Sequence, residues 1–129
     1  MRQRLADLLI DDRRCGLRVR RACSFGSRLL GFWPTPRWHG ADVVEFPGCR
    51  AIHSLAMIER IDVVFVDGEG KVLRLISQLP PWRVVADSRA VAVFEFRAGV
   101  VRALGVEMGS RLQTHDRRPF PGGRDGEIG

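Results

Sequence analysis

Two runs of apolar residues with a short polar break between them dominate the middle of the chain. Residues 61–66 read Ile-Asp-Val-Val-Phe-Val, and residues 71–76 read Lys-Val-Leu-Arg-Leu-Ile. Both are rich in β-branched and aromatic residues, which favour extended structure. The intervening Asp-Gly-Glu-Gly is typical of a hairpin turn, with Gly70 at the position of positive φ. The pattern predicts a β-hairpin whose first strand is apolar on both faces except at Asp62.

Shorter apolar runs on both sides of the hairpin extend the β pattern. Helical spacing of apolar residues predicts two short helices, one from Ser24 to Phe32 and one over 98–104 that ends at Gly105. Strands therefore dominate without an alternating βαβ order, which predicts a mainly β fold: a compact antiparallel β sandwich or partly open barrel with two short helices. The other extended segments are expected at 16–22, 41–46, 50–57, 82–85, 90–96 and within 106–112.

The two ends of the chain depart from this pattern. Residues 1–15 are interpreted as a leader or a short helix, because Leu5, Leu8 and Leu9 share one helical face. Residues 114–129 hold few large apolar side chains and several prolines and glycines, so they are predicted to form a disordered tail. A single β domain is therefore expected over 16–113, in keeping with a length of 129 residues.

The composition narrows the partners and the location. The net charge is +6, and every basic residue except Lys71 is an arginine. The arginines are scattered and form no specific nucleic-acid motif, so a solvated basic surface is favoured over a nucleic-acid site. No apolar run approaches the roughly 20 residues of a membrane span, and no signal peptide is visible. We expect a cytoplasmic protein.

The cysteines indicate reduced thiols. Cys15, Cys23 and Cys49 are odd in number and show no CxxC spacing, which argues against a disulfide framework or a structural zinc site. His39, His53, Cys49 and Asp62 provide metal-ligand chemistry, but no second pair at ligand spacing completes a site. We expect no metal site and no bound cofactor.

A collinear series of segments resembles one known family. Residues 49–67, CRAIHSLAMIERIDVVFVD, are similar to a family block that reads CRSIHTFGMRFPIDVVFLD, and residues 79–83 match its LPPWR. The remaining similar segments are an opening strand at 17–19, a helix at 27–32 that parallels SRLRGLL, and a closing stretch at 89–105 that parallels ARAVLELPAG…LG and includes Glu95.

These segments identify the chain as similar to the family called domain of unknown function 192, over about residues 16–112. The chain departs from the family pattern at Arg60, where the family often has Pro, and at Ser54, where it often has Thr. The resemblance implies a compact β fold. It implies no established activity.

One candidate constellation has the residue types of a cysteine nucleophile, a base and an orienting acid. These are Cys49, His53 and Asp62. In an extended strand, positions 49 and 53 share a face but lie about 13 Å apart, so direct contact requires a bend. A buried structural cysteine and a hydrogen-bonded histidine are therefore the favoured interpretation. For Asp62 we favour a pair with Arg83 or Arg89, or hydrogen bonds to loop amides.

A second candidate is an aromatic groove. Trp82, with the preceding prolines and Arg83, and with Trp33 and Trp38, has the chemistry for a planar or anionic ligand, although such rings more often cover the edge of a core. We expect a non-enzymatic binding or accessory module with a cleft near His53, Asp62 and Trp82, for a small-molecule or protein ligand. The alternative is a small enzyme that uses Cys49, His53 and Asp62.

Overall fold

The computed structural model describes residues 5–22, 38, 40–53 and 59–116. It contains strands and one short helix, in the order β1 (Ala6–Ile10), β2 (Arg13–Arg21), β3 (Val43–Pro47), β4 (Ala51–His53), β5 (Ile61–Val66), β6 (Val72–Leu79), β7 (Val84–Ala86), β8 (Ala92–Arg97), α2 (Val100–Leu104) and β9 (Leu112–Asp116).

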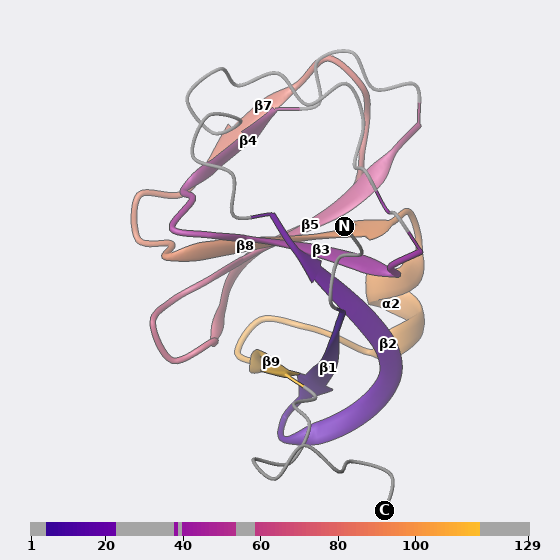
Figure 1. The fold of residues 1–129 in the computed structure, drawn as a ribbon. Helices are drawn as coiled ribbons and strands as arrows, with labels where there is room; N and C mark the ends of the chain where they lie inside the picture. The colour runs from indigo at the N-terminus through magenta and orange to yellow at the C-terminus, as the bar shows by residue number, and fades with distance from the viewer. Residues whose placement is uncertain (1–4, 23–37, 39, 54–58, 117–129) are drawn as a thin grey trace, which may run out of the picture.

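The strands form one large sheet and one small sheet (Figure 1). The large sheet has seven strands in the order β6-β5-β8-β3-β2-β1-β9, and the small sheet pairs β4 with β7. The pairs are antiparallel except β2 with β3, which run parallel, so the large sheet is mixed. It does not close into a barrel. The prediction of a mainly β fold is confirmed.

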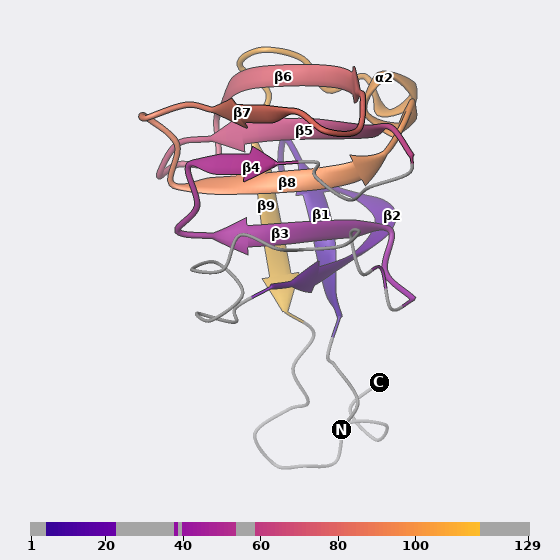
Figure 2. The same cartoon turned by 90° about the horizontal axis from the view of Figure 1, so that it is seen from above.

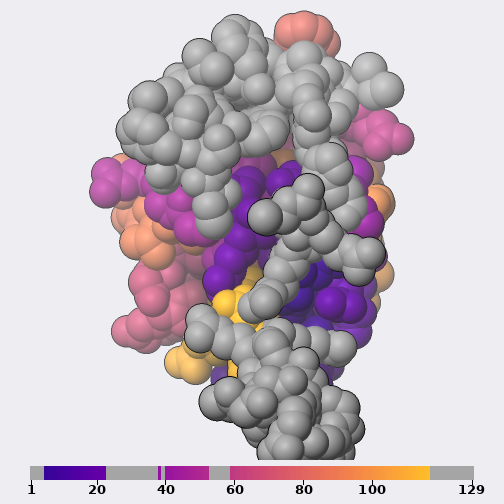
Figure 3. All heavy atoms as spheres, viewed as in Figure 1, coloured from indigo at the N-terminus to yellow at the C-terminus, as the bar shows by residue number. Residues whose placement is uncertain are grey.

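A bend in β2 turns the large sheet into two layers. Gly16 lies inside this strand with a φ of 86°, a conformation that glycine adopts at little cost. Beyond the bend, β1 and β9 run across the direction of β3, β8 and β5 (Figure 2). The first and last described strands are paired, and they lie side by side on the surface (Figure 3).

Two apolar clusters fill the space on the two faces of the central strands. The first lies between the crossed layers and includes Leu8, Phe94, Phe96 and Val101. The second joins the other face of the large sheet to the small sheet, through Ile52 of β4 and the partly buried Val85 of β7. The central strands β5 and β8 are therefore buried on both faces, which is why they read as nearly continuous apolar runs.

The predicted hairpin is confirmed at β5 and β6. Gly70 has a φ of 83°, and a Cβ atom there would collide with the carbonyl oxygen of Leu112. The Asp67 carboxylate accepts hydrogen bonds from the backbone N–H groups of Glu69 and Lys71, both at 2.9 Å. These bonds hold the pKa of Asp67 below its usual range. The turn is therefore fixed by both backbone conformation and side-chain capping.

Other expectations need correction or fall outside the description. Residues 6–10 form β1 and not a helix, because pairing with β2 and β9 outweighs a three-leucine helical pattern. The last strand extends to Asp116, beyond the boundary expected at 113. The helix predicted at 98–104 is confirmed as α2, with Gly105 at a φ of 75° as its C-cap. The helix expected at 24–32 and the chain after 116 lie outside the described residues.

Candidate functional site

Asp62 is fully buried in β5, and its carboxylate is satisfied by backbone. It lies opposite Phe96, on the face of β5 that also carries Val64 and Val66. One carboxylate oxygen accepts a hydrogen bond from the N–H of Gln78 at 2.8 Å, and the other from the N–H of Val101 at 3.0 Å. Asp62 therefore ties β5 to the end of β6 and to the first turn of α2, through one strand amide and one helix-terminal amide. The sequence had suggested Arg83, Arg89 or loop amides as its partners.

The other two members of the proposed constellation lie on the opposite side of the large sheet. Cys49 is half-buried and packs against the second cluster, just before β4. The backbone of His53 ends β4 and pairs with Val84. The structure therefore separates Asp62 from Cys49 by the thickness of the sheet, because successive side chains of a strand point to opposite faces.

The predicted aromatic groove is also divided. Trp82 lies before β7 with 64% of its surface exposed, and Arg83 is exposed beside it. Trp38 instead packs against the second cluster, and the guanidinium of Arg97 lies 4.4 Å from the centroid of its ring. Trp33 lies outside the described residues. Trp38 and Trp82 thus lie in different environments and do not form one groove.

Trp38 and Arg97 line a cavity of about 430 Å³ at the end of β8 where β5 begins. The Arg97 side chain also donates a hydrogen bond from Nη1 to the carbonyl oxygen of Ala41, at 3.3 Å. The remaining lining residues are Glu59, Arg60 and Ala98. We name this cavity the interlayer pocket, because Arg97 projects from the face of β8 that is turned toward the small sheet.

A buried acid lies two residues deeper on the same face. Glu95 of β8 is flanked by Val44 of β3 and Val63 of β5, which both belong to the second cluster. Arg20 of β2 pairs with Val44, so it occupies the same row across the sheet. Both Glu95 and Arg20 are buried. Burial raises the pKa of Glu95 to about 8, and the charge of Arg20 opposes this shift.

Sequence reasoning did not find Glu95 or Arg20 as site residues. The scattered arginines predicted a solvated basic surface, yet Arg20 is 6% exposed. Alternation puts Glu95 on the face of its strand opposite Phe94 and Phe96, and this face is buried as well. The available signal was the apolar character of both neighbouring strands, which makes β8 a central strand. The parallel pairing of β2 with β3, which brings Arg20 into the same row as Glu95, cannot be read from the sequence.

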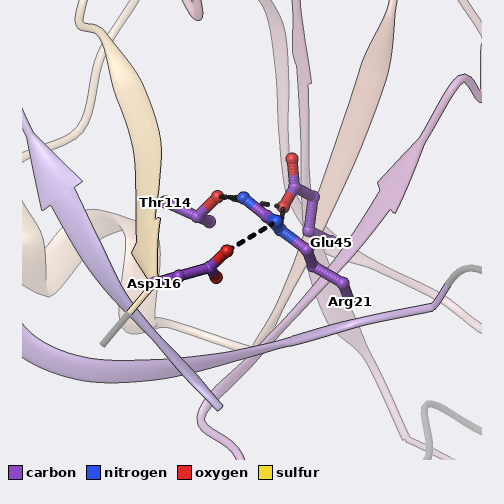
Figure 4. A network of polar contacts seen from close by, with 4 residues as sticks. All are labelled: Arg21, Glu45, Thr114 and Asp116. Carbon is purple, nitrogen blue, oxygen red and sulfur yellow. Dashed lines mark hydrogen bonds and ion pairs between the residues drawn. The ribbon is translucent and has the colours of Figure 1, made fainter. Parts of the chain in front are cut away.

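A second polar cluster lies on the face of the first apolar cluster and joins three strands (Figure 4). Arg21 of β2 is bound to Glu45 of β3 at 3.0 Å, to Asp116 of β9 at 3.5 Å and to the hydroxyl of Thr114. The pKa of Glu45 is raised, because burial is the largest effect. The charge and hydrogen bond of Arg21 and the hydrogen bond of Thr114 act in the opposite direction. Because Arg21 binds side chains of both β3 and β9, we interpret the cluster as a brace between these two strands.

Metal and membrane features complete the description. Among the residues that the structure describes, no group of three or more His, Cys, Asp or Glu residues could hold a metal ion. Within the same part of the chain, α2 is far too short to cross a bilayer, and no other helix is long and apolar enough to do so.

The profile of the family DUF192, described as uncharacterized ACR, matches residues 11–114. The chain belongs to the DUF192 family. A UPF0127 protein from Pyrococcus furiosus is 36% identical over 101 residues, which cover 75% of this chain and 86% of that protein. A UPF0127 protein from Pyrococcus horikoshii is 31% identical over 99 residues, which cover 74% and 85%. The resemblance inferred from the sequence motifs is confirmed.

Two solved structures share the fold of this chain. A putative transcription regulator from Sinorhizobium meliloti has a TM-score of 0.69 and 22% identity, covering 88% of this chain and 96% of that one. A protein of unknown function from Novosphingobium aromaticivorans has a TM-score of 0.66 and 17% identity, covering 84% and 83%. At these identities the likeness concerns the fold. It carries no function to this chain.

Proposed function

We propose that this DUF192 protein is a non-enzymatic binding module that takes a small planar anion in the interlayer pocket. The observation that carries the proposal is the stacking of Arg97 on Trp38 in a cavity of about 430 Å³. This volume falls within the range of about 300–1,000 Å³ that is usual for small-molecule sites. An arginine held over an indole has restricted freedom, and its planar set of donors suits bidentate recognition of a carboxylate.

The charges around the pocket support an acidic ligand. Arg60 and Arg97 contribute two positive charges to the lining, against one negative charge from Glu59. Glu95, on the same face of β8, adds no opposing negative charge at neutral pH, because burial raises its pKa to about 8. The lining of the pocket therefore carries a net positive charge, which suits an acidic ligand.

The test is a titration with benzoate, 2-naphthoate and their neutral amides, followed by NMR shifts of the Trp38 indole. We expect the carboxylates to bind and the amides to bind more weakly. Replacement of the arginine, Arg97→Gln, should lower the affinity about ten- to a hundredfold, because it removes a charged donor pair. Arg102→Gln, in the exposed face of α2, is the matched control and should leave the affinity unchanged. Equal weak binding of all four probes by the three proteins would refute the proposal.

The enzymatic alternative has less support. Asp62 faces the first apolar cluster, and each of its carboxylate oxygens accepts a hydrogen bond from a backbone N–H group. A cysteine nucleophile needs an exposed, low-pKa thiol. Alkylation of Cys49 over a pH series, with Cys15 resolved by peptide mapping, tests this directly. A thiol at position 49 that reacts rapidly below neutral pH would favour the enzyme over the binding module.

A further inference from the structure

Three apolar residues of the small sheet are exposed on its outer face. Ala51 of β4 and Ala86 of β7 are paired, so their side chains share a face, and both are exposed. Val84 belongs to the same face by alternation and is 66% exposed. The inward residues Ile52 and Val85 pack on the second cluster instead. Viewed from above, β4 and β7 lie in front of β8 and β5, with this face outermost (Figure 2).

An exposed indole lies next to this face. Trp82 lies two residues before β7, and 64% of its surface is exposed. Its φ is 64°, in the left-handed region that bulky residues rarely occupy. Backbone strain of this kind persists where the surrounding structure imposes it, and it is frequent at ligand-binding positions. We call Ala51, Trp82, Val84 and Ala86 together the β7 face.

Arginines surround the β7 face. Arg50 and Arg83 are exposed and flank it in sequence. Arg74 is exposed on β6 and donates a hydrogen bond to the carbonyl oxygen of Ala86 at 2.7 Å, which holds its charge at the edge of β7. The acid that follows β7, Asp87, is already bound to Arg89 at 2.7 Å. The rim is therefore positive and complementary to an anionic partner.

We propose that the β7 face docks on an anionic lipid surface. A stable protein interface buries about 800 Å² on each partner, and four side chains, two of them alanine, supply far less. A second copy of the chain would also oppose one arginine rim to another. Peripheral membrane binding needs less apolar area, because an indole at the headgroup level and nearby arginines act together. Single-stranded nucleic acid would use the arginines and the indole, but it would leave Val84 and the alanines without a role.

The test is co-sedimentation of the full chain with vesicles of phosphatidylcholine, with and without phosphatidylglycerol. Wild-type protein should bind the anionic vesicles about tenfold or more tightly than the neutral ones, and added salt should weaken this binding. Trp82→Ala should lower the binding about tenfold, while Trp82→Phe should retain most of it. Arg83→Gln should lower it about fivefold. Met108→Ala, at a residue 60% exposed in the turn between α2 and β9, is the matched control and should bind as wild type.

Several outcomes would overturn the docking proposal. They are no vesicle binding, equal binding to neutral and anionic vesicles, and wild-type binding by Trp82→Ala. Tighter binding to a single-stranded oligonucleotide or to a poly-glutamate peptide than to anionic vesicles would also overturn it. Melting curves of each variant establish that lost binding does not reflect unfolding. The interlayer pocket lies elsewhere, so failure here leaves the proposed ligand site untouched.

Discussion

Two buried carboxyl groups lie on neighbouring central strands and are accommodated in opposite ways. Asp62 of β5 and Glu95 of β8 are almost adjacent in register, yet they point to opposite faces of the sheet, because Asp62 pairs with Phe96 and Glu95 with Val63. Asp62 receives a backbone N–H on each oxygen. For Glu95, burial raises the pKa of the carboxyl. The charge of Arg20 lowers this pKa, but its effect is the smaller one, so that the pKa rises.

The difference distinguishes a buried acid that stabilises the fold from one that marks a candidate binding site. Backbone donors at fixed positions make Asp62 part of the folding framework, since its partners are the ends of β6 and α2. Glu95 instead lies on the face that leads to a ligand-sized cavity, and its protonation state responds to its surroundings. Perturbed titration near a pocket is a better indication of a binding site than burial alone.

The largest expected effect is on the pH dependence of stability. The folded protein keeps a proton on Glu95 that the unfolded chain, with a carboxyl pKa of about 4.3, releases. The free energy of unfolding should therefore fall as the pH rises toward the folded pKa of about 8, by up to about 1.4 kcal/mol per pH unit. Glu95→Gln should remove this slope, as measured by urea unfolding at pH 5–9. Parallel pH curves for the two proteins would contradict it, and exposed Glu59→Gln is the control.

The next effect is the loss of a backbone bond at Asp62. An asparagine can accept with one atom, while its NH₂ group would oppose the second backbone N–H. Asp62→Asn should therefore lower the free energy of unfolding by about 1–3 kcal/mol at pH 7. Asp42→Asn is the matched control: Asp42 accepts one backbone N–H, from Arg18 at 2.9 Å, which an amide oxygen can replace. Unchanged urea midpoints for Asp62→Asn would mean that its two hydrogen bonds contribute nothing.

Truncation of β9 tests the cluster around Glu45, a carboxyl of intermediate burial. A chain ended after Gln113 loses Thr114 and Asp116, which share Arg21 with Glu45, as well as part of the pairing of β9 with β1. It should be less stable by about 1 kcal/mol, whereas a chain ended after Asp116 should melt as the full chain does. Thermal melts of the three lengths measure this. If both truncations melt alike, the brace adds no stability.

The smallest expected effect is at Asp87, whose own side chain is 9% exposed but whose partner Arg89 is 65% exposed. Asp87 is held by Arg89, and the hydrogen bonds from that side chain and its backbone lower the pKa of Asp87 to about 2. Its contribution is present above the unfolded pKa of about 3.9 and is lost as the pH falls through the folded value. Asp87→Asn should lower the melting temperature only slightly at pH 7, since a pair with an exposed arginine contributes little. A large loss at pH 7 would show that the pair contributes more than the exposure of Arg89 suggests.

Local patterns predicted the hairpin and the orientation of Asp62, but not the site. The run at 61–66 alternates as expected, with Asp62 on the face of Val64 and opposite Val63. The pairing of β1 with β9 and the parallel step from β2 to β3 are long-range contacts that leave no local signal. The parallel pairing of β2 with β3 places Arg20 in the same row as Glu95. These two buried residues therefore could not be found from their spacing in the sequence.

The pairing of Ala6 with Asp116 also has a consequence for synthesis of the chain. β1 leaves the ribosome first, but its partner β9 is made about a hundred residues later, so one side of β1 stays without its partner strand while the intervening strands are translated. Closing such a large loop is entropically costly, and sheets dominated by distant contacts fold slowly. Unpaired strand edges during this interval favour aggregation. Expression at lower temperature, or with chaperones that hold nascent chains, should therefore raise the yield of folded protein.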